Sequence, residues 1–387
     1  MNQYYTAESV TEGHPDKLCD LIADSVLDAC LDHDMFSHVA CEVMVTKGNI
    51  IVAGEITSSY EPHIPSIVRS VLEKVGYDPA RYAVQCFIHK QSPDIAAGVD
   101  CSLELRRGRT DGNPVLEMGA GDQGIMVGYA CNETPQMLPL PVVLARRLTT
   151  RLTMVRKSGA VAGLRPDGKA QVTVEYDEDG KPLRLDTIVL SAQHNPEKPM
   201  DELFWQLTDS VLEPALLPLL PDKSTKILIN PAGQFVLGGP EADTGLTGRK
   251  LMVDSYGVFA PHGGGAFSGK DPTKVDRSGA YMARYIAKNL VAAKLCERCQ
   301  ITLAYAIGVA EPVMVEVDTF GTGTICADDC LADAVRYVFG LTPGDILAHF
   351  DLPTPFYAKA TACGHFGNLE FPWEHTDKAK ILRAAVI

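Results

Sequence analysis

The same order of elements is predicted three times along the chain: a helix, a hairpin of two strands and a second helix. Helices are indicated where apolar residues recur at helical spacing, and strands where apolar and polar residues alternate. The second occurrence covers 142–157, 171–190 and 200–212, and the third covers 279–295, 301–318 and 328–339. Helices packed on one face of a hairpin sheet bury an apolar core and so can form a small domain. We therefore expect an α+β fold of three domains with one shared architecture.

The first occurrence starts with a helix after Gly13, followed by a hairpin over 39–57, a helix over 64–75 and a strand over 82–89. Pro15 suits the first position of that helix. Asp16 lies in its first turn, where the positive end of the helix attracts anions. We therefore expect the start of this helix to belong to a binding site.

Aspartates recur every four residues along the first helix, at Asp16, Asp20, Asp24, Asp28 and Asp32. Like charges at this spacing repel each other. We therefore expect the last three to face water.

The hairpin over 39–57 contains two glutamates. If Gly48 and Asn49 form the turn, the numbers of opposite residues sum to 97 and Glu42 faces Glu55. Carboxylates this close repel each other. Either both side chains reach solvent, or a cation lies between them.

Composition limits the class of protein. A chain of 387 residues is long for one core, and 46% hydrophobic with 22% charged residues is typical of a globular protein. The net charge of −14 argues against a nucleic-acid binder, so local lysines and arginines must hold any anionic substrate. The first eight residues do not form a signal peptide, and charged residues and prolines interrupt the most apolar run, 211–220. We expect a cytoplasmic protein.

Eleven cysteines in a chain of this length indicate reduced thiols rather than a disulfide framework. Two pairs, Cys296 with Cys299 and Cys326 with Cys330, could be combined into a four-thiolate zinc site. Neither pair has the turn residues of a zinc knuckle. Thiols in the core and on the surface are therefore the favoured interpretation.

The segment 262–277 is the strongest candidate for a binding site. Three successive glycines start it, and Lys270, Lys274, Asp271 and Asp276 follow. Glycine amides and lysines suit a polyphosphate, and carboxylates suit the Mg²⁺ that accompanies it. The spacing resembles a P-loop, but Asp271 stands where that motif needs Ser or Thr, so we reject it. A glycine-rich surface turn is the alternative.

Further cations and carboxylates lie in other glycine-rich segments. They are Asp167, Lys169, Asp243, Arg249 and Lys250. The segment 119–124 holds Asp122 among three glycines and could bind a nucleoside, although an ordinary loop explains it nearly as well. The stretch between residue 91 and this segment has no clear periodicity, which is typical of a lid.

Taken together, these motifs resemble those of the methionine adenosyltransferase family, also called S-adenosylmethionine synthetases. The resemblance runs from 8–17 to 364–374, and 119–124 and 263–278 match two specific family signatures. It implies three similar domains about a pseudo-threefold axis, with short segments exchanged between them. The approximate boundaries are 1–101, 112–232 and 233–387, with a gate loop at 91–118.

The resemblance also implies the reaction. The adenosyl group of ATP is transferred to the sulfur of L-methionine, giving S-adenosylmethionine, and the tripolyphosphate is hydrolysed to pyrophosphate and phosphate. Two Mg²⁺ ions per site and K⁺ are the implied cofactors. The implied assembly is a homodimer or a dimer of dimers, with each active site between two subunits and no nucleic-acid or membrane partner.

Roles for individual residues follow from the same resemblance. The catalytic residues are His14, Lys169, Lys270 and Lys274. ATP is bound by His14, Asp122, Asp167, Lys169, Gln234, Phe235, Asp243, Arg249, Lys250, Ala266 and Lys270. Methionine is bound by Glu55, Gln91, Asp243 and Lys274. Asp16 and Asp276 hold Mg²⁺, and Glu42 holds K⁺.

Two positions depart from the family pattern. Gln234 stands where the family usually has Arg, and Ala232 where Thr is common. The run around Phe235 is predicted to be strand-like, so if Phe235 stacks on adenine, Gln234 points away from it. Other functions remain open from the residues alone: an ATP-dependent kinase or polyphosphate hydrolase, or a non-catalytic nucleotide-binding subunit.

Overall fold

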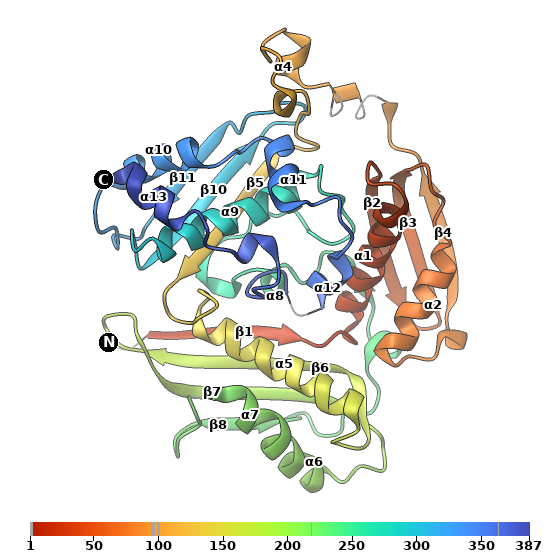
Figure 1. The fold of residues 1–387 in the computed structure, drawn as a ribbon. Helices are drawn as coiled ribbons and strands as arrows, with labels where there is room; N and C mark the ends of the chain where they lie inside the picture. Colours follow the sequence, from red (N-terminus) through yellow and green to blue (C-terminus); the bar gives the residue numbers. More distant parts are fainter. Residues whose placement is uncertain (1–2, 94–96, 99–100, 218, 363) are drawn as a thin grey trace.

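A computed structural model describes residues 3–93, 97–98, 101–217, 219–362 and 364–387. These residues form three β-sheets covered by helices, so the predicted α+β class is confirmed (Figure 1). The predicted helices and hairpins are present, with ends shifted by a few residues. Within the described residues, every helix is too short or too polar to cross a membrane.

The first sheet has the strand order β4-β3-β2-β9. The strands are β2 (His38–Thr46), β3 (Asn49–Thr57), β4 (Ala83–His89) and β9 (Gly245–Leu246). Helices α1 (Pro15–His33) and α2 (Ile64–Val75) cover one face, and the short helix Pro79–Arg81 precedes β4. Alternate residues of β2, such as Val39, Cys41 and Val43, are buried against these helices.

The second sheet has the order β1-β6-β7-β8 and its own hydrophobic core. The strands are β1 (Gln3–Val10), β6 (Leu164–Tyr176), β7 (Pro182–His194) and β8 (Lys226–Ile229). Helices α5 (Leu140–Ser158), α6 (Met200–Leu207) and α7 (Glu213–Leu216) cover it, and the π-helix Thr208–Leu212 joins the last two.

The third sheet has the order β11-β10-β5. The strands are β5 (Gly124–Cys131), β10 (Arg298–Tyr305) and β11 (Met314–Asp318). The helices after β9 are α8 (Leu251–Asp254), α9 (Val275–Ala292), α10 (Asp328–Val338), α11 (Pro343–Phe350), α12 (Tyr357–Thr361) and α13 (Ala379–Val386). The short 3-10 helices here are Gly239–Glu241, Gly257–Phe259 and Pro372–Glu374.

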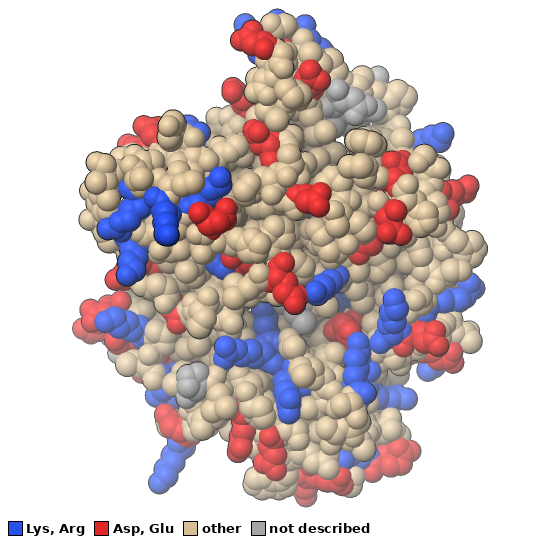
Figure 2. All heavy atoms as spheres, in the orientation of Figure 1, with Lys and Arg blue, Asp and Glu red and all other residues tan. Residues whose placement is uncertain are grey.

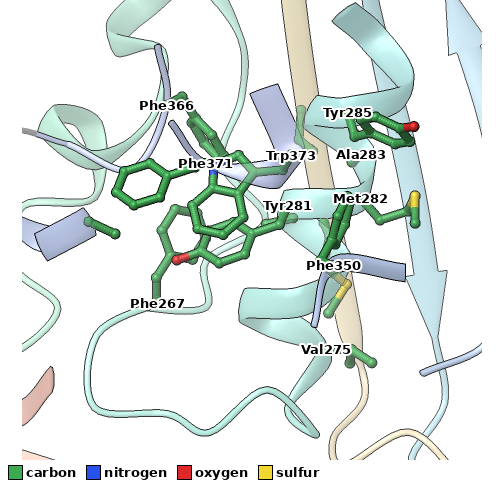
Figure 3. Packing of buried hydrophobic residues seen from close by; sticks show 14 of the residues in the cluster. Phe267, Val275, Tyr281, Met282, Ala283, Tyr285, Phe350, Phe366, Phe371 and Trp373 are labelled. Atoms are coloured by element: carbon green, nitrogen blue, oxygen red, sulfur yellow. The ribbon is translucent and has the colours of Figure 1, made fainter. Parts of the chain in front are cut away.

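Aromatic packing holds α9 in place. Tyr281 on this helix stacks on Trp373 with ring centroids 3.7 Å apart, and Phe371 stacks on the other side of Trp373 (Figure 3). Offset and stacked rings of this kind add to the energy of burial. The N-terminus of α9, which carries the predicted Mg²⁺ ligand Asp276, is therefore attached to a rigid core.

Three strands lie in the sheet of a neighbouring unit. Strand β1 precedes α1 but pairs with β6, and β5 precedes α5 but pairs with β10 (Figure 1). Strand β9 precedes α9 but pairs with β2. Each sheet therefore receives one strand from another part of the chain. None of these three strands was predicted from the sequence.

The register of the first hairpin differs from the prediction. Thr46 pairs with Asn49, so the turn is one residue earlier and opposite residues sum to 95. Gly48, with a φ of 72°, takes the left-handed conformation as the second turn residue. Glu42 consequently lies opposite Ala53 and not Glu55. The two glutamates still share a face of the sheet, because residues two apart in a strand point the same way.

The expectation that the last three aspartates of the α1 ridge face water was wrong for Asp24 and Asp28. Asp24 is fully buried and accepts two hydrogen bonds from Arg277, each at 2.7 Å. Asp28 accepts from the backbone N–H groups of Tyr357 and Ala358 at the start of α12. Helix α1 is thus packed on a second side, where each carboxylate finds a donor. Asp32 is exposed, as predicted.

The segment predicted to be a gate is only partly described, since 94–96 and 99–100 lie outside the described residues. Its second half contains α4 (Leu103–Arg106) and the 3-10 helix Pro114–Leu116, which project from the top of the molecule in Figure 1. The amide of Leu103 donates to Gly308 O, and Glu104 accepts from Ala310 N. These bonds attach it to the loop after β10.

The cysteines of the two predicted pairs are free thiols. Cys296 and Cys299 are buried, Cys326 is half-buried and Cys330 is exposed, which agrees with thiols in the core and on the surface. In the described part of the chain, no three or more His, Cys, Asp or Glu side chains are grouped to hold a metal ion. The zinc-site alternative therefore has no support in the structure.

Candidate active site

His14 caps the N-terminus of α1. Its Nδ1 accepts a hydrogen bond from the amide of Asp16 at 3.2 Å, and its side chain is buried. Burial, together with the positive charges of Lys250 and Lys169, lowers the pKa of His14 to about 3. The imidazole is therefore neutral near pH 7. Because Nδ1 is an acceptor, the single ring proton lies on Nε2.

Asp16 is held at the same helix terminus. Its Oδ1 accepts from the amide of Leu246 at 3.0 Å, and its Oδ2 accepts from Nζ of Lys250 at 2.6 Å. Arg249 lies 3.8 Å from Oδ1. Burial favours a higher pKa, but the bonds from Lys250 and Leu246 outweigh it and keep the pKa of Asp16 below its ordinary value. Asp16 is thus ionised among cations.

Asp167 lies on β6 beside this cluster. Its Oδ2 accepts from the amide of Gly239 at 2.8 Å, whereas its Oδ1 is buried and makes no hydrogen bond within the described residues. Burial raises the pKa of Asp167, and the charge of Asp243 adds to the effect while Lys169 opposes it. Asp167 therefore presents an unused acceptor close to Lys169 and Asp243.

The strand-like conformation predicted around Phe235 was wrong, because this segment belongs to no strand. The backbone of Phe235 instead pairs with His194: its N–H donates to His194 Nε2 at 3.1 Å, and its carbonyl accepts from His194 N at 2.9 Å. The buried His194 thus supplies the hydrogen-bond partners that a neighbouring strand would otherwise give to the backbone of Phe235. Phe235 is half-buried and Gln234 is exposed.

Lys270 and Asp276 form an ion pair in the segment 262–277. A Cβ at Gly265 would lie 2.2 Å from the carboxyl carbon of Asp276, and one at Gly263 would lie 1.5 Å from the carbonyl oxygen of Ile125. Two of the three successive glycines are therefore required by packing of the loop against α9 and β5. The loop is placed directly on the carboxylate of Asp276.

Asp271 is turned into the protein. It is fully buried, accepts from the amides of Val39 and Thr273, and pairs with Lys274 at 2.6 Å. Burial favours a higher pKa, but Lys274 and Thr273 keep the pKa of Asp271 below its ordinary value. This carboxylate therefore anchors the loop on β2 and orients Lys274.

Glu42 of the first sheet lies near both Lys270 and Glu55. Burial raises the pKa of Glu42, and the charge of Glu55 raises it further while Lys270 lowers it. Glu42 is accordingly a carboxylate for which added positive charge would be favourable.

Residues predicted to bind methionine line one cavity of about 410 Å³. Glu55, Gln91 and Lys274 lie in its wall, together with Asp122. The cavity thus offers carboxylates, an amide and an ammonium group to a small zwitterion. Asp243, which was also predicted to contact methionine, is not among its lining residues.

The predicted residues thus fall into two groups. The His14 group comprises His14, Asp16, Asp167, Lys169, Asp243, Arg249 and Lys250. The Lys270 group comprises Glu42, Glu55, Gln91, Asp122, Lys270, Lys274 and Asp276. Among the described residues, no hydrogen bond or ion pair joins one group to the other. Ala266 lies close to Gly248.

The sequence did not point to Gln193, although its side chain joins two segments that carry predicted ATP-binding residues. Its Oε1 accepts from the amide of Asp167 at 3.2 Å, and its Nε2 donates to the carbonyl of Val236 at 3.0 Å. It therefore connects β7 with the segment that carries Phe235. The only signal in the sequence is its place at the end of the second hairpin.

Comparison with known families covers nearly the whole chain. The model of the S-adenosylmethionine synthetase N-terminal domain matches 2–93, the central domain matches 117–235 and the C-terminal domain matches 237–375. The three matches follow one another along the chain in the order N-terminal, central and C-terminal domain. The chain therefore belongs to the S-adenosylmethionine synthetases, the methionine adenosyltransferases that make S-adenosylmethionine from ATP and methionine.

Proposed function

We propose that ATP and methionine react between the His14 group of one chain and the Lys270 group of a second copy. The observation that carries this proposal is the division of the predicted residues into two groups, between which the described residues form no hydrogen bond or ion pair. The first supplies cations for phosphates, and the second supplies the cavity with Glu55, Gln91 and Lys274. A closed dimer brings unlike patches of two chains together twice, so it forms two complete sites.

In this reaction the methionine sulfur attacks C5′ of ATP. The S–C5′ bond forms as the C5′–O5′ bond breaks, and the electron pair leaves with O5′ on the tripolyphosphate. A thioether has no proton to lose, so no general base is required. The protein must align the reactants and stabilise negative charge on the leaving oxygen.

His14 is suited to the leaving oxygen. Its Nδ1 is occupied by the amide of Asp16, so its remaining N–H, on Nε2, is available to donate to O5′. The low pKa of about 3 keeps it a neutral donor throughout the physiological range. Lys169, Lys250 and Arg249 of the same group would hold the phosphates, with Lys270 from the second copy.

Asp16 and Asp276 would hold Mg²⁺. Bound Mg²⁺ would neutralise charge that develops on the tripolyphosphate. Each carboxylate is already paired with a lysine, Asp16 with Lys250 and Asp276 with Lys270, so each lies where cations and phosphates gather. One carboxylate per ion fits the way Mg²⁺ binds, since phosphates and water complete its shell. The absence of larger ligand clusters among the described residues agrees with this.

Glu42 would hold K⁺. Its pKa is raised by burial and by Glu55, so a monovalent cation beside it would relieve both effects. Glu55 would then bind the ammonium group of methionine in the cavity, and Lys274 its carboxylate.

The unused Oδ1 of Asp167 would accept a hydrogen bond from the nucleoside. It is a buried acceptor without a partner in the described residues, and adenine and ribose both offer donors. Phe235, whose segment is tied to Asp167 through Gln193, would stack on the base. Asp122, Asp243 and Ala266 would complete the nucleotide site.

We also propose the finer arrangement of the chain. The cyclic exchange of β1, β5 and β9 supports three domains about a pseudo-threefold axis, with approximate boundaries at 1–101, 112–232 and 233–387. The gate at 91–118 would cover the cavity. Hydrolysis of tripolyphosphate to pyrophosphate and phosphate would follow in the same site, in the cytoplasm.

The shared site can be tested by mixing two inactive variants. His14→Asn damages only the first group, and Asp276→Asn only the second. In a mixed dimer one site carries both defects and the other carries none. Co-expressed chains should recover roughly a quarter of the S-adenosylmethionine formation, since half of the random dimers are mixed and half of their sites are intact.

Each variant alone serves as the control and should form no S-adenosylmethionine above background. A site contained within one chain predicts no recovery on mixing, because every chain then carries a defect. Pyrophosphate and phosphate are measured in the same assay, so loss of the hydrolytic step is separated from loss of the transfer.

A further inference from the structure

Another cavity lies outside both residue groups, between α5 and the segment 364–368. Its volume is about 380 Å³, and cavities of roughly 300–1,000 Å³ hold small organic ligands. None of the residues assigned to ATP, methionine or metal ions is among the described residues that line it. The cavity is therefore not part of the proposed active site.

The wall of this cavity is positively charged, whereas the chain as a whole is negatively charged. Arg146, Arg147 and Arg151 of α5 line it, and no Asp or Glu is found among the described lining residues. The chain as a whole carries a net charge of −14. Figure 2 shows Lys and Arg side chains gathered at the middle of this face, where α5 crosses it. A local positive potential is expected there.

Backbone carbonyls hold Arg147 and Arg151 in place. Arg147 donates from Nη1 to Leu217 O at 2.9 Å, and Arg151 donates from Nε to Ser210 O at 2.8 Å. In the part of the chain that the structure describes, each side chain makes this one hydrogen bond, and neither forms an ion pair. A guanidinium group carries five N–H donors. Both groups are thus positioned and still able to donate to an anion.

The remaining wall is largely apolar. Met154 and Pro214 line it and are exposed, whereas Leu138 and Phe366 line it but are almost completely buried. Beneath them, Arg146 is buried and donates to the carbonyls of Val253 and Ser255. Inorganic phosphate could bind the guanidinium groups, but it would leave the apolar surface of the cavity exposed to water. An anion with an apolar body would cover both surfaces.

We propose that this cavity binds a small organic anion, an aromatic or aliphatic acid. Its acidic group lies on Arg147 and Arg151, and its apolar body lies against Met154 and Pro214. Charge-assisted hydrogen bonds to the guanidinium groups orient it, and burial of the apolar body adds affinity.

A fluorescence titration of the full chain tests this site with two probes. 8-Anilinonaphthalene-1-sulfonate carries an anion on an apolar body, and N-phenyl-1-naphthylamine has the same rings without the charge. The sulfonate should bind at one saturable site per chain, more tightly than the neutral probe. Arg147→Gln and Arg151→Gln should each weaken its binding about tenfold or more, without affecting the neutral probe.

Arg184→Gln is the matched control. It makes the same change in net charge on β7, where Arg184 pairs with Glu175, and it should change sulfonate binding by less than about twofold because solvent and salt screen distant charges. Met154→Glu covers the case in which an arginine variant is unstable. Met154 is exposed, so a carboxylate there should repel the anion without disturbing the fold.

Three outcomes would overturn the proposal. The first is sulfonate binding that none of the three cavity variants weakens. The second is equal weakening by Arg184→Gln, which would mean that only net charge matters. The third is displacement of the probe by ATP with Mg²⁺, which would place it in the nucleotide site.

Discussion

At the residue scale, the neutral His14 has a consequence for stability. Its folded pKa of about 3 is below the unfolded value near 6.5, so the unfolded chain binds the extra proton between these pH values. Stability contributed by this site therefore rises with pH through that window and falls as the solution becomes acidic. The geometry that makes His14 a neutral donor also makes the fold sensitive to acid.

His14→Asn should reduce this sensitivity, because asparagine keeps a capping oxygen but does not titrate. From pH 7 to pH 5 the wild-type chain should lose about 2 kcal/mol more unfolding free energy than the variant. This follows from about 1.4 kcal/mol per pH unit over the roughly 1.5 pH units between the unfolded pKa near 6.5 and pH 5. Urea denaturation at the two pH values measures it. His33→Asn, on the same helix but exposed, is the control, and equal losses in all three proteins would contradict the assignment.

Neighbouring aspartates of the 262–277 segment have opposite roles. Asp276→Asn should abolish S-adenosylmethionine formation and leave the melting temperature nearly unchanged, because its carboxylate is partly exposed at the proposed Mg²⁺ position. Asp271→Asn should lower the melting temperature by several degrees, because it unpairs a buried contact with Lys274. Turnover and thermal unfolding are measured on both. Near wild-type turnover in Asp276→Asn would remove that residue from the site.

At the scale of elements, buried ion pairs join helices that are far apart in the sequence. Arg277, one residue after Asp276 on α9, forms two bonds to Asp24 of α1 and also donates to the carbonyl of Lys270. Helix α1 carries His14 and Asp16 at its N-terminus, and α9 carries Asp276. The Asp24–Arg277 pair therefore fixes the two helices that carry these residues relative to each other. Arg284 and Lys288 of α9 similarly pair with Glu374 near the C-terminus.

Breaking the Asp24–Arg277 pair should be costly. Asp24→Asn leaves a buried guanidinium group with no compensating charge, and the expected loss of unfolding free energy is about 3–5 kcal/mol. Asp333→Asn, which removes an exposed pair with Arg336, should cost under about 1 kcal/mol. Denaturant titrations of both variants compare them. Similar small losses would show that the buried pair does not hold α1 to α9.

At the scale of the whole molecule, the three exchanged strands connect the units. Strand β1 closes the edge of the second sheet by pairing over Gln3–Val10 with β6. Strand β1 is therefore part of a sheet whose other strands begin more than 100 residues later in the sequence. The same relation holds for β5 and β9 in the other two sheets.

Removal of residues 1–8 should expose β6, because its edge amides lose their partners. Hydrogen exchange measured by mass spectrometry should become faster in β6 and remain unchanged in the β2–β3 hairpin. Since His14 is retained, the first helix is not directly altered. Faster exchange confined to residues 10–60, with β6 still protected, would contradict the exchange of β1.

The sequence by itself determined the local elements and the family. Helical spacing over 142–157 and 328–339 and alternation over 171–190 predicted elements correctly because these patterns depend on neighbours within a few residues. Glycine-rich loops with lysines and aspartates indicated a phosphate site because the residue types carry the chemistry. The family matches agree with the motifs in these loops.

Only the tertiary structure decided which partners these elements have. Strands β1, β5 and β9 pair with segments distant in sequence, so no local pattern marks them. Asp24 is buried and Asp28 is half-buried because Arg277 and α12 reach them from the other end of the chain. The hairpin register followed from the left-handed conformation of Gly48, which a glycine permits but does not specify. The division of the site into two groups likewise depends on which loops meet in space.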